Sequence, residues 1–367
     1  MWPSRRFHNA TMKNSISVAS NVILRSCALG SPYTGSFNHA KSVDERYPRT
    51  VLKNDRLRVN VYLPDHRHGY YRSCRFDWSS MVGPVELDGK VQMLVDWRTP
   101  HDPLNPEHGI GFAFEFGMPG AVDPAGYDQS VHFLKLGVGI CRKESLTMPY
   151  NFSFPYPVVD PGKWTVNQSG ETELKFSHRI HFQGWAYSYE KKLSLRDNEL
   201  HIAHSLENTG EKPLYSWAYS HNLFQIKNRT VGPGYSFRLP FQISANDFAN
   251  NCVGNPAQVL LPDCSQPASS PVNNFTFSRK LVETDVLYCD FTAALTAQQG
   301  ALHGASSHRF SVSDKNYGGM SKEGTEKVES YHFYATDSVL AVEPFMRIAI
   351  QPGHRQMWHH KIKFHQN

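Results

Sequence analysis

An imidazole at the end of a predicted strand is the first candidate for proton transfer. In YSWAYSHNLFQI, Trp217, Tyr219 and His221 share one parity, so their side chains are expected on one face of a strand. If that face is concave, His221 lies near its rim, with Asn222 beside it. Histidine titrates near neutral pH even when unperturbed, which suits it to give or take a proton. A structural histidine, satisfied in the core or at a strand edge, is the alternative.

A carboxylate inside an apolar strand is the second candidate. Glu343 follows Val339–Val342, and Pro344 comes directly after it. A buried carboxylate is costly unless it is hydrogen-bonded or functional, and burial would raise its pKa toward that of a general base. Proline cannot donate to a ladder, so we expect a bulge or an edge there. A buried structural salt bridge is the alternative.

Two earlier segments could hold a substrate. Arg72 and Arg75 flank a small turn in YYRSCRFDWSSMV, and an arginine fork can bind hydroxyls or an anion, although a structural ion pair is equally expected. In PEHGIGFAFEFG, His108 precedes a glycine, which lets a loop approach a ligand closely; an exposed loop histidine is the alternative. Glu115 in the same segment needs a partner if it is buried.

Composition excludes several classes of function. Of 367 residues, 40% are hydrophobic and 13% aromatic, enough for a large core. The net charge of +5 is dispersed rather than gathered in a basic patch, so we expect no nucleic-acid partner. No apolar run reaches the ~18 residues that cross a bilayer. The sequence carries no nucleotide-binding glycine motif and no metal-ligand spacing, so neither a cofactor nor a metal is expected.

The cysteines and histidines were weighed as ligands as well. The six cysteines form no zinc spacing; Cys252 and Cys264 could pair, but buried free thiols are favoured. His359 and His360 alternate to opposite faces of a strand, which makes HHKIKFH a poor metal site.

The strands that must position these residues extend from about residue 48. WAYSYEKKLSL alternates, with Trp185, Tyr187 and Tyr189 on one face, and RDNE then supplies a turn before LHIAHSL; this predicts a β-hairpin. Similar strands recur, without a sustained helical period and with frequent glycine and proline. We therefore predict an all-β fold, a large antiparallel β-sandwich, with residues 48–367 as one domain.

The N-terminus differs in kind. Residues 1–43 contain no acidic residue, but they contain Arg5, Arg6 and many serines. Such a leader is typical of an organellar transit peptide. A cytosolic extension is the alternative, so the expected location is cytoplasmic or organellar.

The segments together resemble the aldose 1-epimerase (galactose mutarotase-like) family. YSHNLF and, roughly 120 residues later, VLAVEPFMRIAIQPGHRQMW are the best matches, and FLKLGVGICRK, YPVVDPGKW and LHIAHSLENTGEKPL are also similar. The resemblance spans about residues 48–366. It implies a sandwich with an open concave face that binds sugar, and no cofactor.

The resemblance also implies roles for the candidate residues. Glu343 would be the general base for the anomeric hydroxyl, and His221 the general acid for the ring oxygen. His108 would be a second histidine near that oxygen, and Arg75 would hold sugar hydroxyls, with Asn222, Trp217 and Arg72 as further substrate contacts. The FDWSS after Arg75 and the Gly-Ile-Gly after His108 depart from the family's usual patterns. The resemblance predicts His221 and Glu343 facing each other across a sugar-sized gap.

The substrate remains open at this stage. It is expected to be a small carbohydrate, free or phosphorylated, and a phosphate would require another cation such as Arg72, Lys135 or Arg347. A glycoside hydrolase or lyase on the same sandwich would require a second acid, Glu115 or Asp77, near Glu343. A non-catalytic carbohydrate-binding protein is the third alternative.

Overall fold

The protein is described by a computed structural model that covers residues 45–94, 100–117, 123–227, 229–254, 259–260, 272–298 and 307–367. The predicted N-terminal leader lies outside the described residues. Within them the chain is built mainly from antiparallel strands, as the sequence predicts, and no helix there is long and apolar enough to cross a membrane.

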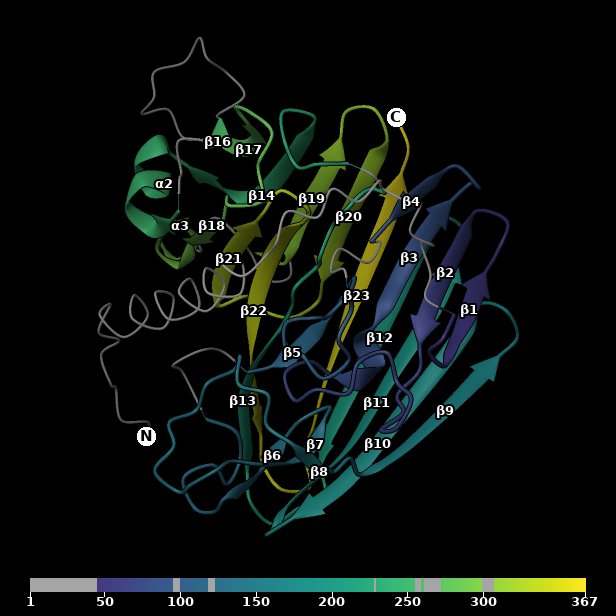
Figure 1. The fold of residues 1–367 in the computed structure, drawn as a ribbon, viewed down its shortest axis with the longest axis vertical. Helices are drawn as coiled ribbons and strands as arrows, with labels where there is room; N and C mark the ends of the chain where they lie inside the picture. The colour runs from purple at the N-terminus through teal and green to yellow at the C-terminus, as the bar shows by residue number, and fades with distance from the viewer. Residues whose placement is uncertain are drawn as a thin grey trace.

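The largest layer is a ten-stranded sheet, seen behind the other strands in Figure 1. Its strands, in spatial order, are β16 (Val259–Leu260), β17 (Val272–Phe277), β14 (Tyr235–Ile243), β19 (Arg309–Asp314), β20 (Gly318–Gly324), β23 (Arg355–His365), β12 (Glu199–Asn208), β11 (Trp185–Arg196), β10 (Glu173–Phe182) and β9 (Lys163–Ser169).

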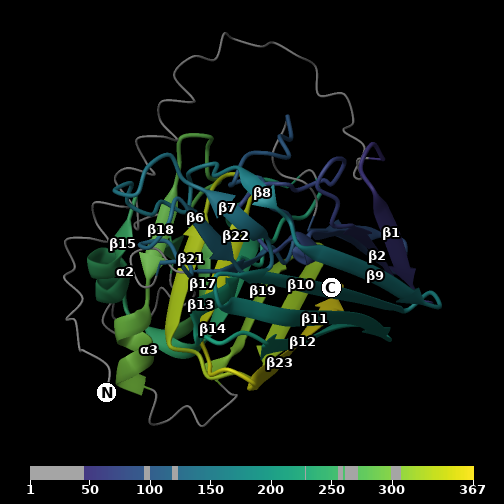
Figure 2. The ribbon, with the colours of Figure 1, turned by 90° about the horizontal axis from the view of Figure 1, so that it is seen from below.

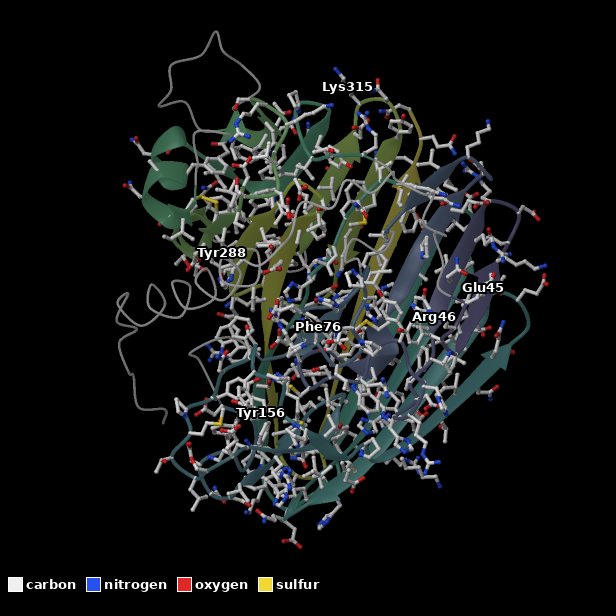
Figure 3. The ribbon with its side chains drawn as sticks, in the orientation of Figure 1. Glu45, Arg46, Phe76, Tyr156, Tyr288 and Lys315 are labelled. Atoms are coloured by element: carbon white, nitrogen blue, oxygen red, sulfur yellow. A yellow bond between two sulfur atoms is a disulfide. The ribbon has the colours of Figure 1, made fainter. Side chains whose placement is uncertain are left out.

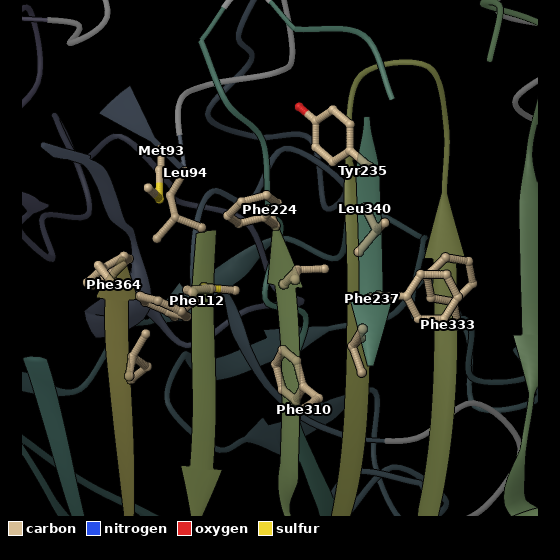
Figure 4. Packing of buried hydrophobic residues seen from close by; sticks show 14 of the residues in the cluster. Met93, Leu94, Phe112, Phe224, Tyr235, Phe237, Phe310, Phe333, Leu340 and Phe364 are labelled. Carbon is tan, nitrogen blue, oxygen red and sulfur yellow. The ribbon is translucent and has the colours of Figure 1, made fainter. Parts of the chain in front are cut away.

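A six-stranded sheet packs against one part of this layer and carries the candidate site. It runs β15 (Cys252–Val253), β18 (Leu287–Asp290), β21 (Ser330–Ala335), β22 (Leu340–Ile350), β13 (Leu214–Ser220) and β5 (Phe114–Phe116). Figure 2 shows the two layers from below. The core between them is rich in phenylalanine, and Figure 4 shows Phe112, Phe224, Phe310, Phe237 and Phe333 packed there.

Smaller elements complete the described part. A four-stranded sheet contains β1 (Arg49–Lys53), β2 (Leu57–Tyr62), β3 (Val82–Leu87) and β4 (Val91–Met93). A three-stranded sheet contains β6 (His132–Lys135), β7 (Gly139–Arg142) and β8 (Val158–Asp160). The short helices are η1 (Trp78–Ser80), α2 (Ala245–Asn251) and α3 (Thr292–Gln298).

The predicted hairpin is confirmed. Strands β11 and β12 pair from Tyr187↔Asn208 to Arg196↔Glu199, and Asp197 adopts the left-handed φ of 51° at the turn. The buried face also holds Lys191, which pairs with the buried carboxylate of Asp77. Alternation therefore places a charge in the core, where a partner from a distant segment neutralises it.

The expectation for two of the cysteines is wrong. Cys252 and Cys289 lie opposite each other on β15 and β18 and form a disulfide, so neither is a free thiol. Sequence spacing could not pair them, because antiparallel register brings them together across 37 residues of separation. Cys74 and Cys141 are buried free thiols, as expected, and Cys264 lies outside the described residues.

Candidate functional site

The site begins at the turn after β13, where the backbone bonds first to the segment before β5 and then to the start of β22. The His221 amide donates to the Ala113 carbonyl at 2.9 Å, and the Phe224 amide donates to the Leu340 carbonyl at 2.8 Å. Between them Asn222 takes a left-handed φ of 51°, a conformation that asparagine tolerates better than most residues. This turn aims the His221 ring toward β22.

Strand β22 is continuous at Pro344, so the predicted bulge is not found. Its pairing with β21 runs from Leu340 to Phe345 without a register shift, and its pairing with β13 begins at Phe345. Beside residues 341–344 the β13 ladder is therefore missing, which is the edge-like position that proline tolerates. Glu343 lies within this stretch, next to the turn that carries His221.

Asn222 fills part of that missing ladder. Its side-chain amide donates to the carbonyls of Ser220 and Val342, both at 2.7 Å, and its Oδ1 accepts from Ser220 Oγ and Lys322 Nζ, both at 2.9 Å. The residue is 0% exposed. The predicted substrate contact for Asn222 is therefore wrong: its hydrogen-bonding atoms are used within the protein, and they fix the backbone on either side of the site.

His221 and Glu343 are in direct contact. Nδ1 of His221 lies 2.7 Å from Oε1 of Glu343, and the residues are 9% and 4% exposed. Their side chains meet on the expected face, but without the sugar-sized gap that the resemblance implies.

The other nitrogen of His221 faces an arginine. Nε2 lies 3.1 Å from Nη2 of Arg75 and 3.7 Å from Oε2 of Glu115. A guanidinium has no acceptor, so Nε2 must accept this hydrogen bond while Nδ1–H donates to Glu343. The contact therefore fits a neutral ring, and a proton on Nε2 requires Arg75 to withdraw.

Charge around the ring favours its protonation. Burial lowers the pKa of His221, but the Glu343 and Glu115 carboxylates outweigh that effect and hold the pKa above its usual value. Phe76 packs edge-on against the ring, with centroids 4.9 Å apart, and lies near the centre of Figure 3. The two carboxylates thus favour the charged ring, whereas the Arg75 contact on Nε2 favours the neutral one.

Arg75 is the hub of the site. Its Nε donates to Glu115 at 2.8 Å, Nη1 to Glu107 at 2.5 Å and Nη2 to the Tyr219 hydroxyl at 3.3 Å. The Phe152 ring covers the guanidinium at 4.4 Å. Glu107 is partly exposed. Among the partners of Arg75 it is therefore the one that a ligand could most readily replace.

Glu115 is a structural anion. It is fully buried and accepts from Arg75 and from the Tyr219 hydroxyl at 2.7 Å, while Lys135 Nζ lies 3.4 Å away. Burial raises the pKa of Glu115, but Arg75 and Lys135 bring it far below its ordinary range. Such a carboxylate stays ionised and cannot serve as a general acid.

The remaining predicted residues lie around this centre. Trp217 stands two residues before Tyr219 on the same face of β13 and packs on the Arg347 guanidinium at 5.1 Å. Arg72 donates to the Arg67 carbonyl at 2.8 Å. The His108 ring packs near His101, and its Nδ1 accepts from the Asp102 amide at 2.9 Å, whereas its neighbour Glu107 reaches Arg75.

Sequence reasoning missed one group on this face. His332 lies opposite Glu343 in the β21–β22 register and packs on Phe345, with ring centroids 4.4 Å apart. Its Nδ1 is 2.5 Å from the Tyr288 hydroxyl, and its Nε2 is 2.9 Å from Ser330 Oγ. Desolvation lowers the pKa of His332 and so disfavours its charged form. The only sequence signal was its alternation in SYHFYA.

Several solved structures are similar to this chain over most of its length. The Slr1438 protein of Synechocystis sp. PCC 6803 is similar over 90% of this chain and 100% of its own, with a TM-score of 0.50 and 14% identity. A putative aldose 1-epimerase from Escherichia coli K12 is similar over 87% and 99%, with a TM-score of 0.47 and 11% identity. A galactose mutarotase related enzyme from Lactobacillus acidophilus is similar over 86% of this chain and 97% of its own, with a TM-score of 0.48 and 12% identity.

The chain shares its overall fold with the Slr1438 protein. This likeness concerns the fold alone, because the identities are low. No protein-family model and no curated protein sequence matches the chain. The shared fold therefore accounts for the arrangement of the strands, and the chemistry has to be argued from the side chains.

Proposed function

We propose that this protein interconverts the anomers of an aldose by general acid/base ring opening, as an aldose 1-epimerase does. The observation that carries the proposal is the 2.7 Å contact between His221 and Glu343, with Arg75 against the far side of the imidazole. It joins one group that can accept a proton and one that can donate it, both on an aromatic face of the sandwich.

The proposed reaction needs only two proton transfers. Glu343 takes the proton of the anomeric hydroxyl, and His221 gives a proton to the ring oxygen as the C1–O bond of the ring breaks. Rotation about C1–C2 turns the free aldehyde over, and the reverse transfers close the ring on its other face. No redox step is involved, so the atoms balance without a cofactor.

The surroundings of His221 support its role as the acid. Its raised pKa favours the protonated ring once Arg75 has withdrawn from Nε2, and a proton that leaves Nε2 lets that nitrogen accept from Arg75 again. Arg75 thus stabilises the ring after it has donated. The guanidinium would also hold sugar hydroxyls once Glu107 gives way to the substrate.

The competing activities receive no such support. A hydrolase would need a second titratable acid, but Glu115 and Asp77 are fully buried in ion pairs with Arg75 and Lys191. A binding protein without catalysis would be favoured by a wide separation of His221 and Glu343, which instead touch. Free aldoses and aldose phosphates both remain substrates to test, since Arg347 is an exposed cation beside Trp217.

Proton NMR of anomer exchange tests the proposal. The purified protein would be added to a panel of free aldoses and their phosphates, each freshly dissolved as one anomer. We expect anomer equilibration to accelerate in proportion to protein concentration for at least one sugar. Cleavage of a glycoside or unsaturation of a uronide, with no anomer exchange on any sugar, would overturn the proposal in favour of a hydrolase or lyase.

A further inference from the structure

A second cluster of ligand-type side chains shares no residue with the candidate site. His308, just before β19, and His360, on β23, both approach Glu326, which follows β20. Oε1 of Glu326 lies 2.7 Å from Nδ1 of His308 and 2.6 Å from Nε2 of His360. The three residues come from three separate segments, and their ligand atoms all lie within 4.8 Å of one another.

Several buried polar atoms of this cluster lack a hydrogen-bond partner among the described residues. His308 and His360 are each 2% exposed, and the Glu326 side chain is 7% exposed. Both ring nitrogens of His308 and Oε2 of Glu326 lack a hydrogen-bond partner among the described residues. Nδ1 of His308 is close to Glu326 but is not oriented to share a hydrogen with it. Buried polar atoms left in this way are costly, and a bound ion would relieve the cost.

The donor set matches a divalent transition metal. Two imidazole nitrogens and one carboxylate oxygen are the protein ligands of many zinc sites, with bonds of about 2.0–2.2 Å to N and O. Around a tetrahedral ion such ligand atoms lie about 3.3–3.6 Å apart. An ion therefore fits if the side chains move outward by less than about 1 Å, with a fourth position left for water.

The neighbouring charges leave room for a cation. The buried ammonium of Lys322 interacts with Glu326 only over a longer range, while its Nζ donates to Asn222 Oδ1 at 2.9 Å. Among the described residues, the Glu326 carboxylate pairs with the two histidines and with no lysine or arginine.

We propose that His308, Glu326 and His360 bind a divalent transition-metal cation of the Zn²⁺ class. The ion would tie the end of β20, the segment before β19 and the middle of β23 together. Its role would be structural, because neither His221 nor Glu343 is among its ligands. The proposal does not depend on the anomer-exchange chemistry.

Metal analysis and spectroscopy test the site. Tag-free protein would be stripped with a chelator, dialysed and titrated with Zn²⁺, and with Co²⁺ as a spectroscopic probe. We expect one Zn²⁺ per chain, visible d–d absorption for Co²⁺, and a rise in Tm of at least about 4 °C with saturating Zn²⁺. Wild-type protein that binds no stoichiometric metal would overturn the proposal.

Matched variants locate the ion. Glu326→Gln and His308→Gln are expected to lose at least 10-fold in Zn²⁺ affinity together with the Co²⁺ spectrum. His359→Gln is the control, because His359 stands next to His360 in sequence but pairs with His201, with 3.2 Å between Nε2 and Nδ1. Binding lost in His359→Gln, or kept in both of the other variants, would contradict the proposed site. If the two buried-site variants fail to fold, the Co²⁺ spectra of wild type and His359→Gln still decide the question.

Discussion

The side-chain amide of Asn222 donates to the Val342 carbonyl at 2.7 Å and so links the residue after His221 to the residue before Glu343. Lys322 completes the link by donating to Asn222 Oδ1 at 2.9 Å. Both side chains are 0% exposed, and burial lowers the pKa of Lys322 to about 7. The spacing of the proposed acid and base is thus set from inside the core, behind the surface that a substrate would touch.

The first prediction concerns this internal link. Lys322→Met keeps the length of the side chain but removes its donor, so the turn at Asn222 should loosen and the His221–Glu343 geometry should become less defined. We expect kcat for anomer exchange to fall about 10- to 100-fold, because small misplacements of reacting groups are costly. The ¹⁵N signals of His221 should report a shifted pKa.

An exposed lysine provides the comparison. Lys361→Met on β23 removes a partly exposed amine that pairs with Glu323 at 3.0 Å, and it should leave kcat unchanged. Wild-type kcat and an unshifted His221 pKa in Lys322→Met would show that the internal link has no positioning role.

The second prediction concerns the buried anion Glu115. In Glu115→Gln, Arg75 and Lys135 lose the charge that compensates their burial, so the free energy of unfolding at pH 7 should fall by ~3–5 kcal/mol. Because the folded pKa of Glu115 is depressed, its contribution is present above the unfolded pKa of about 4 and is lost as the pH falls. Denaturant titrations at pH 7 and pH 3.5 measure both effects.

The difference between wild type and Glu115→Gln should therefore shrink toward low pH. Glu190→Gln serves as the control, since Glu190 is a half-exposed partner of Lys175 and its loss should cost less than ~1 kcal/mol. A deficit for Glu115→Gln that is the same at both pH values would contradict the electrostatic explanation.

The third prediction concerns the disulfide. Cys252–Cys289 closes a loop of 37 residues, so its removal in Cys252→Ser should lower the free energy of unfolding by ~3–4 kcal/mol. Adding reductant should destabilise the wild type by a similar amount. If reductant destabilises Cys252→Ser as strongly as the wild type, the effect does not come from this bond.

Local pattern was enough to predict the strands and to single out the two central side chains as candidates. The alternation in 185–206 gave the hairpin, and Glu343 was recognisable because a carboxylate in an apolar strand needs a reason. The direct contact with His221 was not predictable, since it depends on how the turn at Asn222 follows β13. The expectation for Pro344 was a bulge or an edge, and the edge-like position is what the structure has: the β13 ladder begins beyond Pro344, so no bulge is needed.

Contacts between segments that are distant in the sequence could not be predicted from local pattern. Glu107 joins Arg75, Lys322 joins Asn222, and His308 and Glu326 join His360, each across a sequence separation that only the sandwich closes. For His360 the alternation was correct, because His359 does point to the other face. The expectation of no metal site rested on spacing along the sequence, which could not relate His308, Glu326 and His360 to one another.

The acid/base pair itself is tested most directly by comparing anomer exchange in the wild type and in Glu343→Gln. The substitution keeps the shape of the side chain but removes its basicity, whereas Glu190→Gln makes the same chemical change on the surface. With the sugar that the wild type accelerates most, the account predicts that kcat falls by about 10²–10⁴-fold in Glu343→Gln and stays unchanged in Glu190→Gln. Full activity in folded Glu343→Gln would contradict it.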